Sequence, residues 1–243
     1  MTHKVFDTIR EILNKVEESQ LESICAAGKI LADCTERGGI IHVFGTGHSH
    51  MLAEELFFRA GGLANVNAML DSAVMLHESA QTSTDIERLE GYARIILSRY
   101  QISPKDVMII VSNSGRNAVP IEMAILAREA GLAVLAVTAL DYSKSQASRH
   151  SSHLHLYEVA DCVLDTCGVP GDAAVDVEGL NQRIVGTSTI IGATVLQAVI
   201  YEVVKILIER GLTPPTVVSV NKEGTGDPNR ENLEKYRSRI RHY

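Results

Sequence analysis

The chain has no tryptophan, and only 5% of its 243 residues are aromatic. Proteins that bind flavins or nucleotide bases commonly stack the flat ring on aromatic side chains. The scarcity of such side chains therefore disfavours a flavin-binding or nucleotide-binding protein of the flavodoxin type.

Basic charge is also scarce. Lysine and arginine number 23 against 30 aspartate and glutamate residues, which gives a formal net charge of −7. Binding to a phosphate backbone requires a concentrated basic face. The one basic cluster, residues 230–241, is short and contains Glu231 and Glu234. We therefore expect no nucleic acid among the partners of this protein.

The sequence also lacks the patterns of disulfide frameworks, structural zinc sites and membrane spans. Its four cysteines form no C-x-x-C pair, so they are predicted to be reduced thiols in the core. No run approaches the roughly 18 apolar residues of a membrane helix, and the first residues are polar, unlike a signal peptide. The expected location is the cytoplasm, with no membrane partner.

What the chain does have is enough apolar sequence for a large core. Hydrophobic residues make up 45% of it, and no linker rich in proline, glycine or serine divides it. We therefore predict a single domain over residues 1–243. Within it we expect N-terminal helices over residues 1–37, an α/β core over 38–210 and a C-terminal tail over 211–243.

The N-terminal extension has the apolar spacing of helices. Apolar residues recur on one face before Ser19 and on another face after Glu22. Because Ser19-x-x-Glu22 matches a capping box, the extension is predicted to form two helices, and Gly38-Gly39 is predicted to end the second.

Strands and helices then alternate along the core. The predicted order is strand 40–44, helix 49–60, strand 63–68, helix 84–99, strand 107–111, helix 118–130, strand 132–138, strand 159–165 and helix 186–210. Such alternation is typical of a three-layer α/β/α sandwich, here with a five-stranded parallel sheet covered by helices on both faces.

Two further segments bear on function. Residues 165–179 contain many turn and acidic residues, which predicts an irregular segment that covers the site or carries its base. The predicted helix 186–210 is apolar nearly all round, and a helix of this kind lies under a sheet or at a subunit interface.

Two strand-to-helix loops carry the strongest functional signal. One is Val111-Ser-Asn-Ser-Gly-Arg-Asn117, and the other is Val43-Phe-Gly-Thr-Gly-His-Ser49. In each, hydroxyls, backbone amides and the positive end of the following helix can point at one anion. Because ligands bind beyond the carboxyl ends of parallel strands, the loops predict a phosphate-binding pocket.

Together the loops resemble the sugar isomerase (SIS) domain of phosphosugar isomerases and phosphosugar-binding regulators. The matching motifs, within about residues 35–210, are Gly45-x-Gly47-x-Ser49, Ser112-x-Ser114-Gly115-x-Asn117 and Gly131-Leu-Ala-Val-Leu-Ala-Val-Thr138. The chain is similar to phosphoheptose isomerases in size and N-terminal extension, and also to an uncharacterised bacterial branch of SIS proteins. The resemblance implies a flavodoxin-like fold, a sugar phosphate as ligand, and a homodimer or tetramer.

The resemblance also implies which residues contact the substrate phosphate. They are Gly47, His48, Ser49, Ser112, Asn113, Ser114, Asn117 and Ser188. The family usually has threonine where Asn117 stands, and the exchange keeps a hydrogen-bond donor. Simple N-capping of the last predicted helix is the alternative interpretation of Ser188.

An aldose–ketose isomerase also needs a base that takes a proton from the carbon next to the carbonyl. Glu54 and Glu55 follow the first loop by about one helical turn, and one of them can face the pocket. His77 and Glu78 lie on a polar loop after the second strand. These four residues are the candidates for catalysis, and solvated surface charge is the alternative interpretation of each.

Histidines raise the question of a metal. His50 and Glu54 have the i, i+4 spacing that brings two ligands to one helix face, and His153-x-His155 adds another pair. The resemblance to phosphoheptose isomerases implies a zinc site of His, Glu and Gln, but the ligand-bearing segment is shorter here. We therefore expect no cofactor, with zinc as the alternative.

The expected function is the binding of a phosphorylated sugar and its aldose–ketose isomerisation. One alternative is a regulator that senses a sugar phosphate, although the N-terminal extension is too short for the usual DNA-binding domain. Another is an etherase or deaminase that acts on an amino-sugar phosphate.

Overall fold

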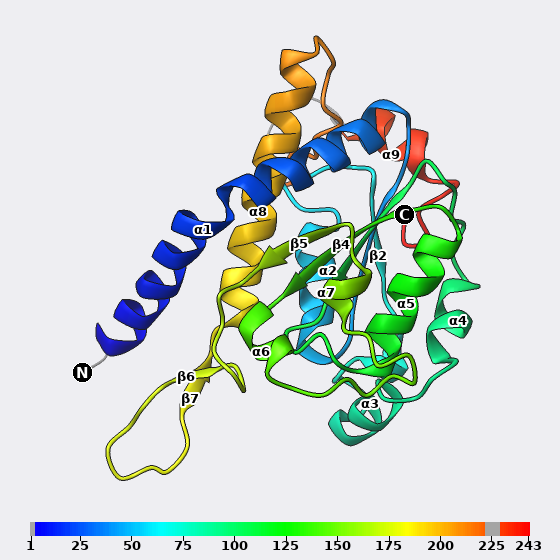
Figure 1. Ribbon diagram of the computed structural model, residues 1–243. Helices are drawn as coiled ribbons and strands as arrows, with labels where there is room; N and C mark the ends of the chain where they lie inside the picture. Colours follow the sequence, from blue (N-terminus) through cyan, green and yellow to red (C-terminus); the bar gives the residue numbers. More distant parts are fainter. Residues whose placement is uncertain (1–2, 222–228) are drawn as a thin grey trace.

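The protein is built around the predicted five-stranded parallel sheet. A computed structural model describes residues 3–221 and 229–243, so residues 222–228 of the predicted tail lie outside the described part. The strand order is β2-β1-β3-β4-β5, with every neighbouring pair parallel (Figure 1). The strands are β1 (Ile41–Gly45), β2 (Val66–Met69), β3 (Val107–Val111), β4 (Ala133–Thr138) and β5 (Cys162–Asp165).

Helices cover both faces of this sheet, which confirms the predicted three-layer α/β/α sandwich. The helical elements are α1 (His3–Glu36), η1 (Gly47–Ser49), α2 (His50–Leu56), η2 (Ser72–Val74), α3 (Ala80–Ile86), α4 (Tyr92–Leu97), α5 (Ala118–Glu129), α6 (Leu140–Lys144), α7 (Leu156–Val159), α8 (Ser188–Glu209) and α9 (Arg230–Tyr236). Side chains alternate between the faces along each strand. In β3, Ile109 packs in the core with α1, α2 and α8, whereas Met108 and Ile110 pack in the core with α4, α5 and α7.

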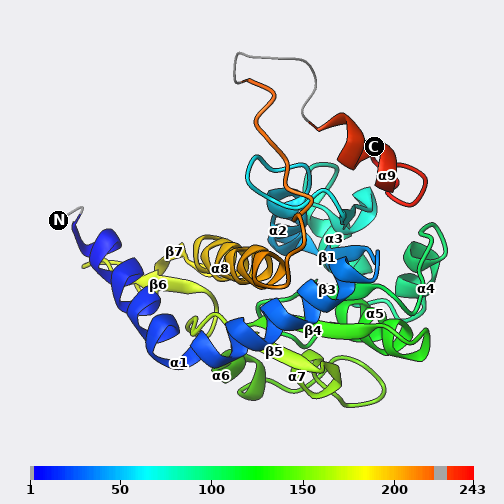
Figure 2. The same ribbon diagram turned by 90° about the horizontal axis from the view of Figure 1, so that it is seen from above.

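The N-terminal extension is one helix of 34 residues, so the prediction of two helices was wrong. The Ser19 hydroxyl donates to the Lys15 carbonyl oxygen at 2.7 Å, one turn back in the same helix, and does not cap a new one. Long-range packing supports the continuous helix, since α1 crosses α8 (Figure 2). Gly28 permits the close approach, because a Cβ at this position would lie 2.6 Å from Cβ of Glu202.

Several other predicted helices and strands have different bounds in the structure. The predicted helix 84–99 is two helices, α3 and α4, and Gly91 precedes α4 with a φ of 89°. The predicted helix 49–60 ends at Leu56. The predicted strand 159–165 begins only at Cys162, after the short helix α7.

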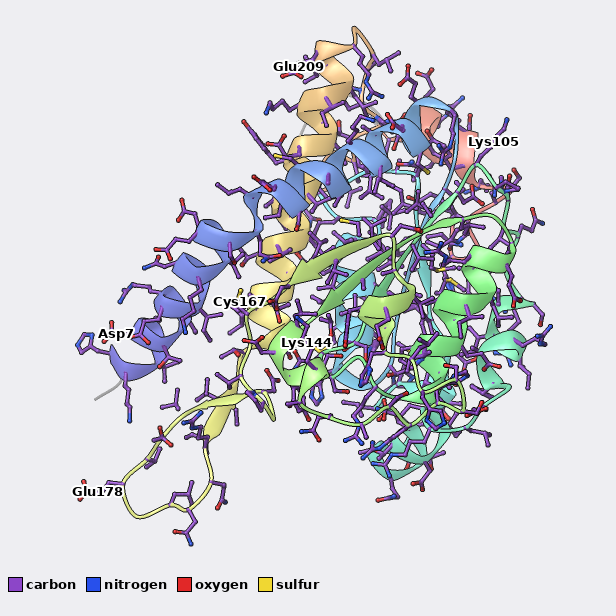
Figure 3. All side chains as sticks on the ribbon, in the orientation of Figure 1. Asp7, Lys105, Lys144, Cys167, Glu178 and Glu209 are labelled. Carbon is purple, nitrogen blue, oxygen red and sulfur yellow. The ribbon has the colours of Figure 1, made fainter. Side chains whose placement is uncertain are left out.

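The segment predicted to be irregular contains part of a hairpin, which corrects that prediction. Strand β6 (Ala173–Val175) pairs with β7 (Ile184–Gly186) in antiparallel orientation. Figure 3 shows Glu178 at the tip of this hairpin, away from the body of the molecule.

Helix α8 combines a core face with an exposed apolar face. By length and composition it could cross a membrane, contrary to the expectation that no segment is apolar enough, and 44% of its 18-residue window is buried. The core helix of a soluble protein satisfies the same criteria. Val195, Val199 and Val203 are buried in the core that α8 shares with α1, whereas Tyr201 and Ile208 are exposed.

The four cysteines are free thiols, as predicted, but the prediction that all lie in the core was wrong for Cys25, which is exposed. Burial raises the pKa of Cys34 to about 12. Burial also raises the pKa values of Cys162 and Cys167, whereas Cys25 is exposed.

Candidate functional site

A cleft of about 380 Å³ lies where β1 and β3 end. The register of the sheet pairs Gly45 with Val111, so the loops that follow the two strands lie side by side. The cleft brings together all the predicted phosphate-contacting residues except Ser188. Its polar lining comprises Thr46, Gly47, His48, Ser49, Ser83, Thr84, Glu87, Ser112, Asn113, Ser114, Arg116, Asn117, Tyr142, Arg149 and Asp172.

The loop after β3 is a tight turn that only glycine fits at its fourth residue. The Ser112 hydroxyl accepts from the Gly115 amide at 3.2 Å, and Gly115 has a φ of 59°. A Cβ on Gly115 would lie 2.6 Å from Oγ of Ser143. The Asn113 side-chain oxygen is buried without a hydrogen-bond partner in the described residues. Such an orphaned polar atom at a cleft is typical of a place where a ligand or water completes the bonding.

Glu87 lines the cleft and joins its two loops, although no sequence pattern pointed to this residue. Thr46 donates its hydroxyl to Glu87 at 2.9 Å, and the Asn117 amide donates to the other carboxylate oxygen at 2.7 Å. Burial raises the pKa of Glu87, partly offset by the hydrogen bond from Thr46. In the sequence Glu87 is one acid in a predicted helix, and only the fold shows that it faces the loops.

Two arginines give the cleft its positive charge, and neither was selected from the sequence. Arg149 donates to the Asn117 side-chain oxygen at 2.8 Å, so both ends of the Asn117 amide bond within the protein. Burial, and then the charges of Arg116 and Arg88, lower the pKa of Arg149. The Nε atom of Arg116 is buried without a partner in the described residues. Only Arg116 could have been selected from the sequence, because it lies inside the serine-rich loop.

Ser188 lies beside the cleft and not in its lining. It borders a smaller hollow that it shares with Ser49 and Asn113. The Asp172 carboxylate accepts from the Ser188 amide and hydroxyl, both at 2.8 Å, and from the Thr187 amide at 3.0 Å. The positive N-terminus of α8 is therefore neutralised by an acid of the same chain.

The four predicted acid–base candidates also lie outside the cleft lining. Glu55 accepts from the Gln197 amide of α8 at 3.1 Å and pairs with Arg59 at 3.3 Å. The Glu54 side chain is 51% exposed. His77 and Glu78 are exposed on the segment before α3.

The histidine pairs do not gather into a metal site. His50 Nε2 and Glu54 Oε2 are 3.5 Å apart, as their helical spacing predicts, and His50 Nδ1 bonds the Gly47 carbonyl. His155 lies 3.1 Å from Glu158 on another segment. Within residues 3–221 and 229–243, no group of three or more His, Cys, Asp or Glu side chains is placed to hold a metal ion. The expectation of no cofactor, with zinc as the alternative, stays a prediction, because a His, Glu and Gln site would also draw on glutamine, and Gln197 lies 3.1 Å from Glu55.

Comparison with known proteins bears on the family and the fold. The family model of the SIS domain matches residues 4–139. A UPF0309 protein of Geobacillus thermodenitrificans is 41% identical over 240 residues, covering 99% of this chain and 96% of the relative. A UPF0309 protein of Thermoanaerobacter pseudethanolicus is also 41% identical, over the full length of both chains.

Among solved structures, a phosphoheptose isomerase from Francisella tularensis has a similar fold. The TM-score is 0.53, with 15% sequence identity, and the match covers 82% of this chain and 94% of that one. At this level of identity the likeness shows a shared fold alone.

Proposed function

The chain belongs to the SIS-domain family, and from this premise we propose that its cleft binds a sugar phosphate and isomerises it between aldose and ketose forms. The name of the Francisella neighbour supports the substrate class. A volume of about 380 Å³ also suits a hexose or heptose phosphate, because small-molecule sites commonly begin at about 300 Å³.

The arginine pair of the cleft is the observation that carries the proposal, although the Glu87 charge offsets part of the repulsion at Arg149. Arg116 and Arg149 repel one another across a serine-lined loop, and a phosphate between them would relieve the repulsion and supply the missing partner of Arg116 Nε. Ser114 adds a hydroxyl, and the 12-residue helix α5 begins directly behind the loop with its positive end toward the cleft. Asn117 then acts as an organiser that holds Glu87 and Arg149 in place.

Glu87 is the best-placed base for isomerisation. Its carboxylate would take the proton from the carbon next to the carbonyl and return it to the former carbonyl carbon through an enediolate, while the hydroxyl proton of the first carbon passes to the former carbonyl oxygen. A raised pKa suits this role, because a base works best with a pKa near the working pH.

A sugar-phosphate sensor is the second candidate, and the bonding of Glu87 favours it. Both carboxylate oxygens of Glu87 already accept hydrogen bonds from the protein, from Thr46 and Asn117. An acid held in this way can serve to brace the two loops without exchanging a proton.

Thermal unfolding with matched ligands tests the binding. A hexose or heptose phosphate is expected to raise the melting temperature, whereas the free sugar is not, because ligand binding stabilises the folded state by RT ln(1 + [L]/Kd). Arg116→Gln and Ser114→Ala should each weaken binding by about 1–3 kcal/mol, the loss expected for a hydrogen bond to a charged group. The control is Arg94→Gln, which removes an exposed arginine outside the cleft.

Two results separate the candidates. Equal stabilisation by free and phosphorylated sugar would contradict the phosphate site itself. Phosphate-dependent stabilisation without deuterium uptake from heavy water next to the carbonyl, across aldose and ketose phosphates, would favour the sensor over the isomerase.

We also propose that residues 1–243 act as a single domain, in the cytoplasm, as a homodimer or tetramer. Apolar contacts tie the first helix, the sheet and the last residues to common cores, which supports one domain. The exposed apolar face of α8 supports assembly.

A further inference from the structure

A second cavity, of about 270 Å³, lies between the end of α4 and the C-terminal segment. Arg239 in its wall pairs with Asp106, the residue directly before β3. The cavity therefore lies toward the amino ends of the strands. Figure 1 shows α9 and the C-terminus at the opposite end of the molecule from α3 and α6, which border the cleft. The lining comprises Arg99, Tyr100, Gln101, Arg237, Ser238, Arg239, Ile240, Arg241 and Tyr243.

The charge of this cavity is opposite to that of the chain. Four of the lining residues are arginines and none has an acidic side chain, in a protein of net charge −7. Arg99 pairs with Asp71, and Arg239 pairs with Asp106. Among the described residues, Arg237 and Arg241 have no carboxylate within 4.0 Å. The cavity therefore holds two arginines whose charge the described side chains leave unpaired.

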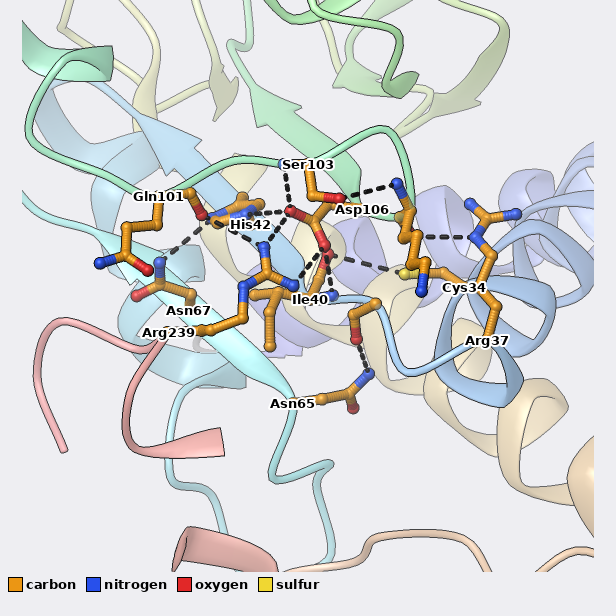
Figure 4. A network of polar contacts seen from close by, with 12 residues as sticks. Cys34, Arg37, Ile40, His42, Asn65, Asn67, Gln101, Ser103, Asp106 and Arg239 are labelled. Carbon is orange, nitrogen blue, oxygen red and sulfur yellow. Dashed lines mark hydrogen bonds and ion pairs between the residues drawn. The ribbon is translucent and has the colours of Figure 1, made fainter. Parts of the chain in front are cut away.

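The wall behind these arginines is held by buried hydrogen bonds (Figure 4). The Asp106 carboxylate is fully buried and accepts from the Ile40 amide at 2.8 Å, the Ser103 amide at 2.7 Å and Arg239 at 2.6 Å. It also lies 3.3 Å from His42 Nε2. Because the Arg239 guanidinium is already fixed in the wall, ligand binding costs little side-chain entropy there.

The aromatic side chains of the cavity are fixed as well. Tyr100 donates to the Leu70 carbonyl oxygen at 3.2 Å, and Tyr243 donates to the Ala64 carbonyl oxygen at 2.8 Å. Arg241 lies over the Tyr100 ring, 5.7 Å from its centroid. The cavity thus presents guanidinium groups on a preformed frame, the arrangement that binds phosphate and carboxylate in two-point fashion.

We propose that this arginine cavity is a second anion site, separate from the cleft, that binds a small soluble molecule with two or more negative charges, such as a phosphorylated metabolite. Arg237 and Arg241 supply the unpaired charge, and Arg99 and Arg239 shape the wall. The size of the cavity suits a compact ligand and not a polymer. The proposal does not depend on the function assigned to the cleft.

Titration calorimetry of the full chain with pyrophosphate tests this site. Arg237→Gln combined with Arg241→Gln is expected to remove one binding event, or to weaken it about tenfold or more, since a contact to a charged group contributes on that order. The event should also survive Ser114→Ala combined with Arg116→Gln in the cleft. It should weaken as sodium chloride is added, because salt screens exposed charges.

A matched control removes two positive charges elsewhere. Arg10→Gln combined with Lys15→Gln, both exposed on α1, should leave pyrophosphate binding unchanged. The melting temperature without ligand shows whether the Arg237 and Arg241 variant remains folded. A folded variant that binds pyrophosphate like the unmodified protein would overturn the proposal, and so would equal losses in the variant and the α1 control.

Discussion

Glu87 illustrates how single residues gain a role from their neighbours. It receives hydrogen bonds from one residue of each phosphate loop, Thr46 and Asn117, and burial raises its pKa. Arg149 bonds to the same Asn117 amide. One amide thus bonds both a carboxylate and a guanidinium, so the proposed base and the proposed anion site are coupled through a single side chain.

Replacing Glu87 by glutamine is expected to remove isomerisation and keep binding. Deuterium uptake next to the carbonyl should fall at least about 100-fold, the usual contribution of a general base, while the thermal shift with sugar phosphate persists. Asp85→Asn, an exposed acid two residues earlier, is the control. In the unmodified protein, uptake should fall as the pH drops through the raised pKa of Glu87, which lies above the usual value for glutamate, because only the carboxylate is a base. Unchanged uptake in the Glu87 variant would remove Glu87 from the mechanism.

At the scale of elements, the two ends of the sheet carry different parts of the molecule. The carboxyl ends of β1 and β3 carry the loops of the cleft, whereas the amino ends anchor the C-terminal segment through Asp106 and Arg239. Phe57, after α2, stacks on the Tyr243 ring with centroids 5.2 Å apart and adds an apolar contact to that anchor. The Asp106 carboxylate is the fully buried polar anchor of this segment, and the Tyr243 hydroxyl adds a hydrogen bond to the Ala64 carbonyl oxygen.

Asp106→Asn is expected to lower the free energy of unfolding by about 3–5 kcal/mol at pH 7, the usual cost of breaking a buried ion pair. Burial alone would raise the pKa of Asp106, but hydrogen bonds from His42 and Arg239 hold it at about 2. Because the folded pKa lies below the unfolded value of about 3.9, ionisation of Asp106 contributes about 2–3 kcal/mol, which is complete above about pH 5 and is lost progressively toward pH 1.

Urea unfolding at several pH values measures this difference. The gap between Asp106→Asn and the unmodified protein should narrow by about 2–3 kcal/mol as the pH falls from about 5 toward 1. Asp85→Asn, at an exposed acid, serves as the control and should show no such gap at pH 7. A gap that stays constant down to pH 2 would contradict the role given to the buried pair.

At the scale of the whole molecule, apolar surface remains after the chain has folded. On α8, Tyr201 is 67% exposed and Ile208 is 60% exposed, and on α1 Leu21 is 58% exposed. Scattered apolar side chains are ordinary on a monomer, but a helix apolar on both faces indicates a second partner. A second copy of the chain is the partner that we propose.

Light scattering after size-exclusion chromatography tests assembly. The unmodified protein is expected to run as a dimer or tetramer at micromolar concentration, and Tyr201→Glu combined with Ile208→Glu should shift it toward the monomer, because the change buries unpaired charge at the interface. Ile95→Glu, at an exposed apolar residue of α4, is the control. Glutamate at Val195 or Val199 would instead damage the fold, since both side chains are buried within the chain. A monomeric unmodified protein would contradict the proposal.

Local sequence determined the sheet and the loops that end its strands. Val107–Val111 is a strand with the predicted bounds, because a short β-branched run between turn residues has few other ways to be buried. The loop with Ser112, Ser114 and Gly115 could likewise be predicted from local sequence, because glycine readily adopts the positive φ that Gly115 has here. The sequence alone thus predicted an α/β protein with two adjoining loops that could bind an anion.

Only tertiary structure decided which distant side chains complete the site. Ser19 and Glu22 form a capping pattern, yet packing of α1 against α8 and the sheet keeps the helix continuous across it. Glu87 and Arg149 are separated from the loop residue Asn117 by about thirty residues on either side, and no local pattern marks them. Spacing along a chain predicts which residues share one helix or strand, but contacts between elements depend on how whole faces pack.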